Sequence, residues 1–290
     1  ELHPWADGVA SYPHRFGHEP VGIAARVGAE VKGVREGDRV TGLFNQAYAD
    51  CCLSSAERIL VVPAGVPDES VLGEPMACLV NAQRRTAVEL ADRVALIGLG
   101  YMGLGMLQLL KLRGPRQIVA IDIREDARDM ATTLGATEAW HPSHVPDQAR
   151  LTRYADWNGE RGFDVVIEAS GTQDGLTLAG ELVRPHGILS ILGYHQGGDR
   201  QVDVGMWNWK AIDVVNAHVR RQADLMTSLR IGLELTAPGY IARVWNLRAL
   251  SGLNIAGMPI EELLFAAAFG AYWSSVYEHF TWRTLARPHS

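Results

Sequence analysis

The spacing of apolar positions changes near residue 75. Before it, short β-type runs bounded by Gly, Pro or Asp stand at 21–28 (VGIAARVG), 38–44 (DRVTGLF) and 58–65 (RILVVPAG). Runs of this kind separated by turn residues are typical of strands. We therefore predict an all-β domain, a small barrel, over residues 1–75.

From residue 76 onward, apolar strands alternate with longer helical stretches. Repeated strand–helix–strand units with uniformly apolar strands predict a parallel, doubly wound sheet. The fold class is therefore α/β, with a Rossmann domain over residues 76–221. The strands are expected at 93–100, 117–123, 163–171, 187–194 and 211–218, and the helices at 102–114, 124–136 and 174–187.

The remaining segment, residues 222–290, has a different character. Nine of the 22 aromatic residues (8 Trp, 8 Tyr and 6 Phe) follow residue 236, and residues 263–277 carry no charge. Because this run is shorter than the ~20 apolar residues that a membrane-spanning helix needs, we predict a buried or interfacial helix. The segment is an atypical, aromatic-rich helical C-terminus.

Composition limits the partners that the chain can have. Hydrophobic residues at 47% and charged residues at 21% indicate a folded chain. A net charge of −6 and a pI near 5.9 provide no basic surface for nucleic acid. Three cysteines make no disulfide framework, which favours the cytoplasm. The chain shows no signal peptide and opens on ELHPW without Met, so we expect the true N-terminus to lie upstream.

A glycine motif, Gly98-Leu-Gly100-Tyr-Met-Gly103, joins a predicted strand to a predicted helix. The first glycine permits a tight turn, the second lets the backbone approach a pyrophosphate, and the third lets the helix pack on the strand. The helix N-terminus adds free N–H groups for phosphate oxygens. The pattern alone also fits an ordinary turn, but its strand–helix setting predicts dinucleotide binding.

Asp122 ends the next strand, 19 residues after Gly103. A carboxylate there accepts hydrogen bonds from the adenosine ribose hydroxyls and repels a 2′-phosphate, which favours NAD over NADP. Arg124 would weaken that preference, but a solvated position at the start of the helix is the simpler interpretation.

His18 and Glu19 stand side by side in FGHEPVG, about 80 residues before the glycine motif. Taken alone, His18 fits a hydrogen-bonded loop histidine. A second carboxylate, Glu74 in GEPMAC, comes just before the dinucleotide domain, and His3 stands in LHPW. These are potential metal ligands and proton carriers.

Together these motifs resemble the zinc-dependent alcohol dehydrogenases of the medium-chain dehydrogenase/reductase superfamily, most closely the polyol and threonine branch. The resemblance extends from residue 1 to about residue 221 and includes REGDRV (35–40), AID (120–122) and EASG (168–171). It implies that residues 1–75 are an N-terminally truncated GroES-like domain. It further implies a small alcohol substrate and NAD.

The resemblance also implies the catalytic site. His18 would be a zinc ligand, and Glu19 and Glu74 would each be a ligand or near-ligand carboxylate. Zinc binds His N and carboxylate O with one position open for substrate, and it lowers the pKa of a bound carbinol. The alkoxide then transfers hydride to the nicotinamide. His3 would pass the proton to solvent, with an exposed terminal histidine as an equal alternative.

Further residues belong to the implied cofactor site. Tyr194 and His195 are expected near the nicotinamide, with loop packing as the alternative, whereas Trp207 and Trp209 are expected to pack. The cofactor-binding set is Gly98, Gly100, Gly103, Tyr101, Met102, Asp122, Ser170 and Gly193.

The chain departs from the family in two ways. The family's cysteine ligand would fall three places before Glu1, and Cys51, Cys52 and Cys78 are poor substitutes; Cys78 is expected to be a buried helix residue. No C-x-x-C lobe follows GDRV, so we predict one catalytic zinc and no structural zinc.

The C-terminus departs further. Pro259, Glu261 and Glu262 resemble the Pro-x-Glu-Glu motif of lycopene cyclase-type domains of carotenoid synthesis, over about 50 residues. An amphipathic helix with the two glutamates in its first turn is one alternative. A join of two genes is another, so we expect a hybrid or truncated chain.

Three functions stay open at this point. The leading hypothesis is an NAD- and zinc-dependent dehydrogenase acting on a secondary alcohol or polyol. The others are a non-catalytic dinucleotide-binding protein and a membrane-associated carotenoid-pathway protein. The run AIDVVNAH (211–218) resembles an edge strand used in pairing, so we expect a homo-oligomer.

Overall fold

The computed structural model describes residues 17–44, 47–66, 68, 71, 73–157, 161–195 and 197–236, and the backbone of 254–255 and 258–259. Residues 1–235 form one compact unit and residues 236–290 a second. Within the second unit, the described part is a short antiparallel pair, β10 (Asn254–Ile255) with β11 (Met258–Pro259). Glu261, Glu262 and the predicted helix at 263–277 lie outside the described residues.

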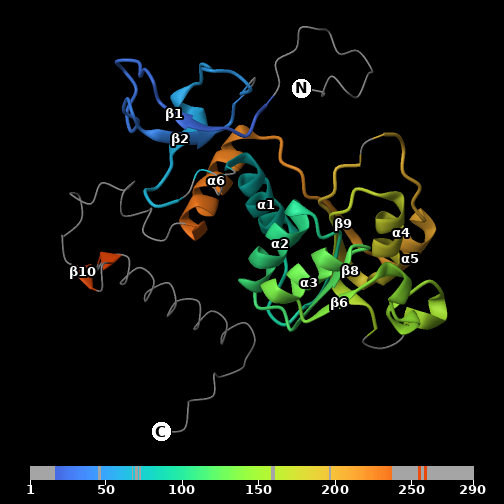
Figure 1. Ribbon diagram of the computed structural model, residues 1–290. Coiled ribbons are helices and arrows are strands. Elements are labelled where there is room, and N and C mark those ends of the chain that lie inside the picture. The colour runs from blue at the N-terminus through green and yellow to red at the C-terminus, as the bar shows by residue number, and fades with distance from the viewer. Residues whose placement is uncertain are drawn as a thin grey trace, which may run out of the picture. The chain divides into compact units, whose positions relative to one another are not determined.

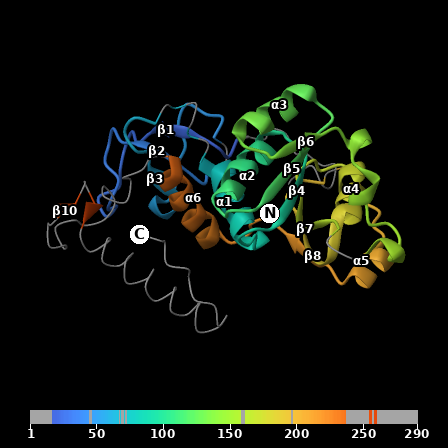
Figure 2. The ribbon, with the colours of Figure 1, turned by 90° about the horizontal axis from the view of Figure 1, so that it is seen from below.

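The N-terminal part of the described chain forms a three-stranded antiparallel sheet in the order β1-β2-β3. Figure 1 labels β1 and β2, and Figure 2 labels all three strands. The strands are β1 (Val21–Ile23), β2 (Arg39–Gly42) and β3 (Ile59–Val61). Each lies inside a predicted run but is shorter than it. Gly42 permits the close pairing of β2 with the chain before β3, because a Cβ there would lie 2.1 Å from the Arg58 carbonyl oxygen. The three predicted strands are confirmed.

The second sheet has six parallel strands in the order β6-β5-β4-β7-β8-β9 (Figure 2). This order reverses between β4 and β7, as in a doubly wound sheet. All five predicted strands are present, which confirms the predicted fold class. The strands are β4 (Arg93–Ile97), β5 (Gln117–Ile121), β6 (Glu138–Trp140), β7 (Phe163–Glu168), β8 (Val183–Ile191) and β9 (Asp213–Asn216).

Helices bury both faces of this sheet. On β4, Val94 and Leu96 pack into one core, while Ala95 and Ile97 pack into the other. Successive residues of a strand point to opposite faces, so a strand covered on both sides is apolar throughout. The helices are α1 (Gly73–Thr86), α2 (Tyr101–Lys111), α3 (Glu125–Leu134), α4 (Gln173–Leu182), α5 (Val204–Lys210) and α6 (Gln222–Thr236), with 3₁₀ turns at Ala56–Arg58, Pro142–His144, Asp147–Ala149 and Tyr154–Trp157.

The predicted helix at 174–187 ends earlier than expected. It stops at Leu182, and β8 begins at Val183. Pro185 explains the difference, since proline lacks the N–H that a helix interior needs and disfavours helical geometry at the residue before it. Strand β6 and helix α5 were not predicted, and of α1 only the helical position of Cys78 was expected.

Helix α6 contacts the first turn of α1. A Cβ at Gly232 of α6 would lie 2.5 Å from Met76 Cγ, and one at Gly73 of α1 would lie 3.3 Å from Leu229. The domain boundaries at residues 75 and 221 stay a prediction. Within the described residues, no helix is both long enough and apolar enough to cross a membrane.

The buried side chain of Lys210 caps the carbonyl groups at the C-terminal end of α4. Its side chain is fully buried, and Nζ donates to the carbonyl oxygens of Gly180 (2.8 Å), Glu181 (3.2 Å) and Val183 (3.0 Å). Burial lowers the pKa of Lys210 to about 8 from 10.5, against the opposing pull of the Glu181 carboxylate.

We expect Lys210→Met to reduce the free energy of unfolding by about 2–3 kcal/mol near neutral pH, because buried carbonyls lose a charged donor. In the unfolded chain Lys210 keeps its proton up to about pH 10.5, whereas in the folded protein it loses the proton above about pH 8. The free energy of unfolding of the wild type therefore rises with pH between about 8 and 10.5. The Met variant lacks that gain. Urea unfolding of both proteins at about pH 7 and about pH 9.5 measures the difference.

Lys111 offers a matched control. Its Nζ also donates to a carbonyl at a helix end, that of Leu134 (2.9 Å), but the residue is exposed. Lys111→Met should therefore cost less than about 1 kcal/mol. Equal losses in the two variants would contradict the role of burial at Lys210.

Candidate functional site

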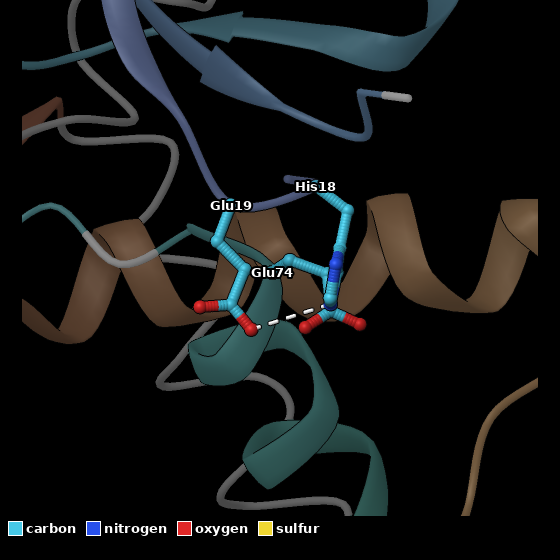
Figure 3. A group of neighbouring side chains, drawn as sticks. All are labelled: His18, Glu19 and Glu74. Carbon is cyan, nitrogen blue, oxygen red and sulfur yellow. Dashed lines mark ion pairs between the residues drawn. The ribbon is translucent and has the colours of Figure 1, made fainter. Parts of the chain in front are cut away.

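His18, Glu19 and Glu74 come together in space. Each offers one ligand atom, and the three atoms lie within 4.8 Å of one another. His18 Nε2 lies 3.4 Å from Glu19 Oε1, and the side chains are 53% and 42% exposed. Figure 3 shows His18 and Glu19 on the segment before β1 and Glu74 on the first turn of α1. Of the residues that the structure describes, no other group of His, Cys, Asp or Glu has this geometry.

The two segments are held by local contacts. Gly17 has φ +94°, and a Cβ there would lie 2.9 Å from Tyr48 N, so only glycine suits the approach to His18. Thr41 of β2 donates to the Pro20 carbonyl oxygen at 2.9 Å. The same threonine lies against Gly73, where a Cβ would be 2.4 Å from its hydroxyl oxygen. Thr41 therefore contacts both segments that carry the cluster.

Cys78 lies one helical turn after Glu74. Its thiol is half-buried and donates to Glu74 Oε1 at 3.1 Å. Burial, followed by the charges of Glu74 and Glu19, raises the pKa of the Cys78 thiol far above its usual range. Cys78 was predicted to be a buried helix residue; its helical position is confirmed, but it is half-buried and not fully buried. Cys51 and Cys52 are exposed and lie outside the His18 cluster.

The glycine motif forms a tight turn between β4 and α2. Gly98 has φ +91°, and a Cβ there would lie 2.5 Å from Ser170 N. A Cβ at Gly103 would lie 1.9 Å from the Gly98 carbonyl oxygen, whereas one at Gly100 would meet nothing within 4 Å. The first and third glycines therefore serve packing, and the second leaves an open face, as phosphate approach requires. Tyr101 is exposed and Met102 partly buried in the first turn of α2.

Asp122 follows β5 and is bonded to the glycine turn. Its Oδ2 accepts from Leu99 N at 2.7 Å, and its Oδ1 accepts from Arg124 N at 2.8 Å. Arg124 is half-exposed; its Nε lies 3.4 Å from Asp122 Oδ1, and its guanidinium donates to the Leu99 carbonyl oxygen. Arg124 stands at the start of α3 and is half-exposed, as expected, but its side chain also folds back onto the aspartate.

The cluster of His18, Glu19 and Glu74 lies near the glycine turn. Burial and the Glu19 carboxylate raise the pKa of Tyr101, the first residue of α2. Helices α1 and α2 also pack closely, since a Cβ at Gly105 would lie 2.4 Å from Leu79 Cδ1. The first turns of these two helices carry Glu74 and Tyr101 respectively. Their packing brings the carboxylate cluster to the glycine turn.

Ser170 and Gly193 lie at the ends of neighbouring strands, β7 and β8, and both are bonded to Glu168. Ser170 N donates to Glu168 Oε1 at 2.7 Å, and Gly193 N donates to the Glu168 carbonyl oxygen at 2.8 Å. Glu168, bonded also to His195 and through it to Arg200, was not predicted to have a role. The signal available in the sequence was the charged residue at the end of an apolar strand, in EASG.

The remaining predicted residues have mixed outcomes. Tyr194 stacks with His218, with ring centroids 6.4 Å apart. Trp207 packs against Gly180, which confirms a packing role, whereas Trp209 is 69% exposed and meets the ring of Tyr154 edge-on. His3 lies outside the described residues, so its proton-relay role stays a prediction.

Two families match the chain. Residues 2–95 match the alcohol dehydrogenase GroES-like domain, and residues 102–232 match the zinc-binding dehydrogenase family. Neither match reaches residues 233–290, and the comparisons give no support to the resemblance of the C-terminus to lycopene cyclase-type domains.

Known proteins of similar sequence are alcohol and polyol dehydrogenases by name. D-arabinitol dehydrogenase 1 of Uromyces fabae is 26% identical over 220 residues, which cover 66% of this chain and 63% of the relative. The NADP-dependent isopropanol dehydrogenase of Clostridium beijerinckii is 27% identical over 225 residues, covering 63% and 62%. The chain thus spans less than two thirds of the length of these relatives.

Solved structures share the fold. Galactitol-1-phosphate dehydrogenase of Escherichia coli superposes with a TM-score of 0.64 at 20% identity, covering 84% of this chain and 78% of that one. This likeness shows the fold, and the two matched families show that the chain is built from an alcohol dehydrogenase GroES-like domain followed by a zinc-binding dehydrogenase domain.

Proposed function

We propose that the chain is an oxidoreductase that transfers hydride from a secondary alcohol or polyol to NAD⁺, with one zinc ion held by His18, Glu19 and Glu74. The observation that carries the proposal is the convergence of these three side chains at the first turn of α1, the helix that packs on α2. The names of the similar dehydrogenases support the reaction class.

The donor set suits zinc. Zinc takes imidazole nitrogen and carboxylate oxygen at 2.0–2.2 Å in a tetrahedral site, which places neighbouring ligand atoms about 3.4 Å apart. The 3.4 Å between His18 Nε2 and Glu19 Oε1 matches that spacing. When bound, zinc supplies a Lewis acid that lowers the pKa of an alcohol hydroxyl. Three protein ligands leave the fourth position for the substrate oxygen.

The chain's own residues supply orientation and cofactor selection. The open face at Gly100 and the N-terminus of α2 suit the pyrophosphate. Asp122 suits the adenosine ribose hydroxyls and disfavours a 2′-phosphate, which supports NAD. The alternative, NADP, is favoured by one observation: Arg124 and Arg128 both lie next to Asp122, with Arg128 donating to its carbonyl oxygen at 2.9 Å.

Exposed edge strand β9 supports the proposal that the protein forms a homo-oligomer. It pairs with β8 on one side, and Asp213, Val214 and Asn216 are exposed. Unpaired strand edges are ready partners for a second strand.

The test is a metal analysis and an NAD reduction screen over secondary alcohols and polyols, with zinc added. We expect about one zinc per chain and NADH formation with at least one alcohol class. Zinc well below one equivalent with intact NAD binding, and no turnover on any alcohol, would show a non-catalytic dinucleotide-binding protein instead.

A further inference from the structure

Glu168 is a fully buried carboxylate at the end of β7. Its Oε1 accepts from Ser170 N (2.7 Å), Gly171 N (2.9 Å) and the Ser170 hydroxyl, and its Oε2 accepts from His195 Nε2 (2.8 Å). A buried carboxylate is costly unless donors surround it, and here both oxygens are satisfied. A side chain so fully engaged holds its neighbours in one arrangement.

The bonds of His195 continue from Glu168 to Arg200. His195 Nδ1 accepts from Arg200 Nε at 3.2 Å, so the proton of the neutral imidazole stands on Nε2 and is donated to Glu168. The Arg200 guanidinium also donates to the carbonyl oxygens of Gly171 (3.3 Å) and Gly198 (3.2 Å). The three side chains, here called the Glu168 network, therefore tie the loop after β7 to the loop after β8.

The loop after β7 borders the glycine turn, and the loop after β8 packs against the loop after β7. A Cβ at Gly98 would lie 2.5 Å from Ser170 N, and one at Gly193 would lie 2.4 Å from Gly171 N and 2.5 Å from Glu168 Oε2. The glycine turn, the two loops and the Glu168 network are thus joined by a series of direct packing contacts.

The strand order predicts on which side of the reversal point each half of a bound dinucleotide lies. The cofactor crosses the carboxyl ends of the strands where the strand order reverses, between β4 and β7. Asp122, after β5, marks the adenosine side. The nicotinamide half therefore falls on the opposite side, at the ends of β7 and β8, where Ser170 and Gly193 lie.

We propose that Glu168, His195 and Arg200 are positioning residues for the nicotinamide half of the cofactor. They act through the backbone of Ser170, Gly171 and Gly193, whose places the network sets. The inference rests on the proposed function and adds to it a specific group of residues for one half of the ligand.

The test compares two probes, NADH and ADP-ribose, which share the adenosine and pyrophosphate groups and differ in the nicotinamide. We expect His195→Ala and Arg200→Gln to raise the Kd of NADH about tenfold and the Kd of ADP-ribose less than about twofold. His195→Gln, whose amide can still donate to Glu168, should recover much of the NADH affinity. Circular dichroism establishes that each variant is folded.

Asp122→Asn serves as the matched control on the adenosine side, and it should weaken both probes to a similar extent. Parallel losses for NADH and ADP-ribose in His195→Ala would overturn the inference, since they would show general damage to the fold, and so would unchanged affinity for both. Failure of the wild type to bind either probe would instead overturn the proposed function itself.

Discussion

Replacing His18 with Ala is expected to lower the zinc content from about one equivalent to below about 0.1 and to reduce NAD-dependent turnover on the order of 10³-fold. His18 is the one nitrogen donor of the cluster. Without it, two part-exposed carboxylates are left, and carboxylate oxygens alone hold zinc less well than a mixed set. A lost Lewis acid removes several kcal/mol of transition-state stabilisation, hence the size of the expected effect.

Metal analysis after dialysis and initial-rate kinetics with added zinc measure the two effects. His144→Ala is the control, because His144 lies in the 3₁₀ turn at Pro142–His144, is exposed and stands outside the cluster. The zinc content and turnover of Glu74→Gln should fall between those of His18→Ala and His144→Ala, because glutamine keeps the shape of the side chain and removes its charge. A full equivalent of zinc in folded His18→Ala protein would show that the ligand assignment is wrong.

Replacing Asp122 with Gly is expected to shift the ratio of NADH to NADPH affinity about 100-fold towards NADPH. Asp122 has a side chain only 10% exposed, and the Arg124 guanidinium lies 3.4 Å from its carboxylate. Loss of the carboxylate removes its repulsion of a 2′-phosphate. It also releases the Arg124 guanidinium to pair with that phosphate, and such charge-assisted pairs are among the strong hydrogen bonds. Two such effects of about 1.4 kcal/mol each give the expected ratio.

Fluorescence titration with NADH and NADPH measures this ratio. Asp122→Asn separates charge from hydrogen bonding, because the amide oxygen can still accept from Leu99 N. Asp126→Ala removes an exposed carboxylate in the first turn of α3 and should leave the ratio unchanged. A ratio unaltered in Asp122→Gly would mean that Asp122 holds the glycine turn and does not meet the ribose.

Local sequence was enough for most of the sheet. The strands β4, β5, β7 and β8 are buried on both faces, so each contains a short unbroken run of apolar residues bounded by turn residues. Strand β6, with three residues, and helix α5, with seven, are too short for periodicity to show. Helix α4 ended early because Pro185 outweighed the helical spacing before it.

The glycine turn and Asp122 could also be predicted from the sequence, because a strand, a turn and a helix N-terminus follow one another directly along the chain. The role of His18 was suggested by a resemblance, but its partner Glu74 stands 56 residues further along, and no local pattern relates the two. Their proximity depends on Thr41, which lies against both segments.

The sequence by itself thus determined the parallel sheet, the dinucleotide turn and the residue types available to a metal, since each follows from neighbours a few positions apart. The family resemblance named Glu19 and Glu74 as partners of His18, but only the tertiary structure placed Glu74 beside it. The tertiary structure alone also decided that Arg124 folds onto Asp122 and that Glu168, His195 and Arg200 form one network. The physical reason is that burial and hydrogen bonding of these groups depend on strand order and helix packing, which bring together residues that lie far apart in sequence.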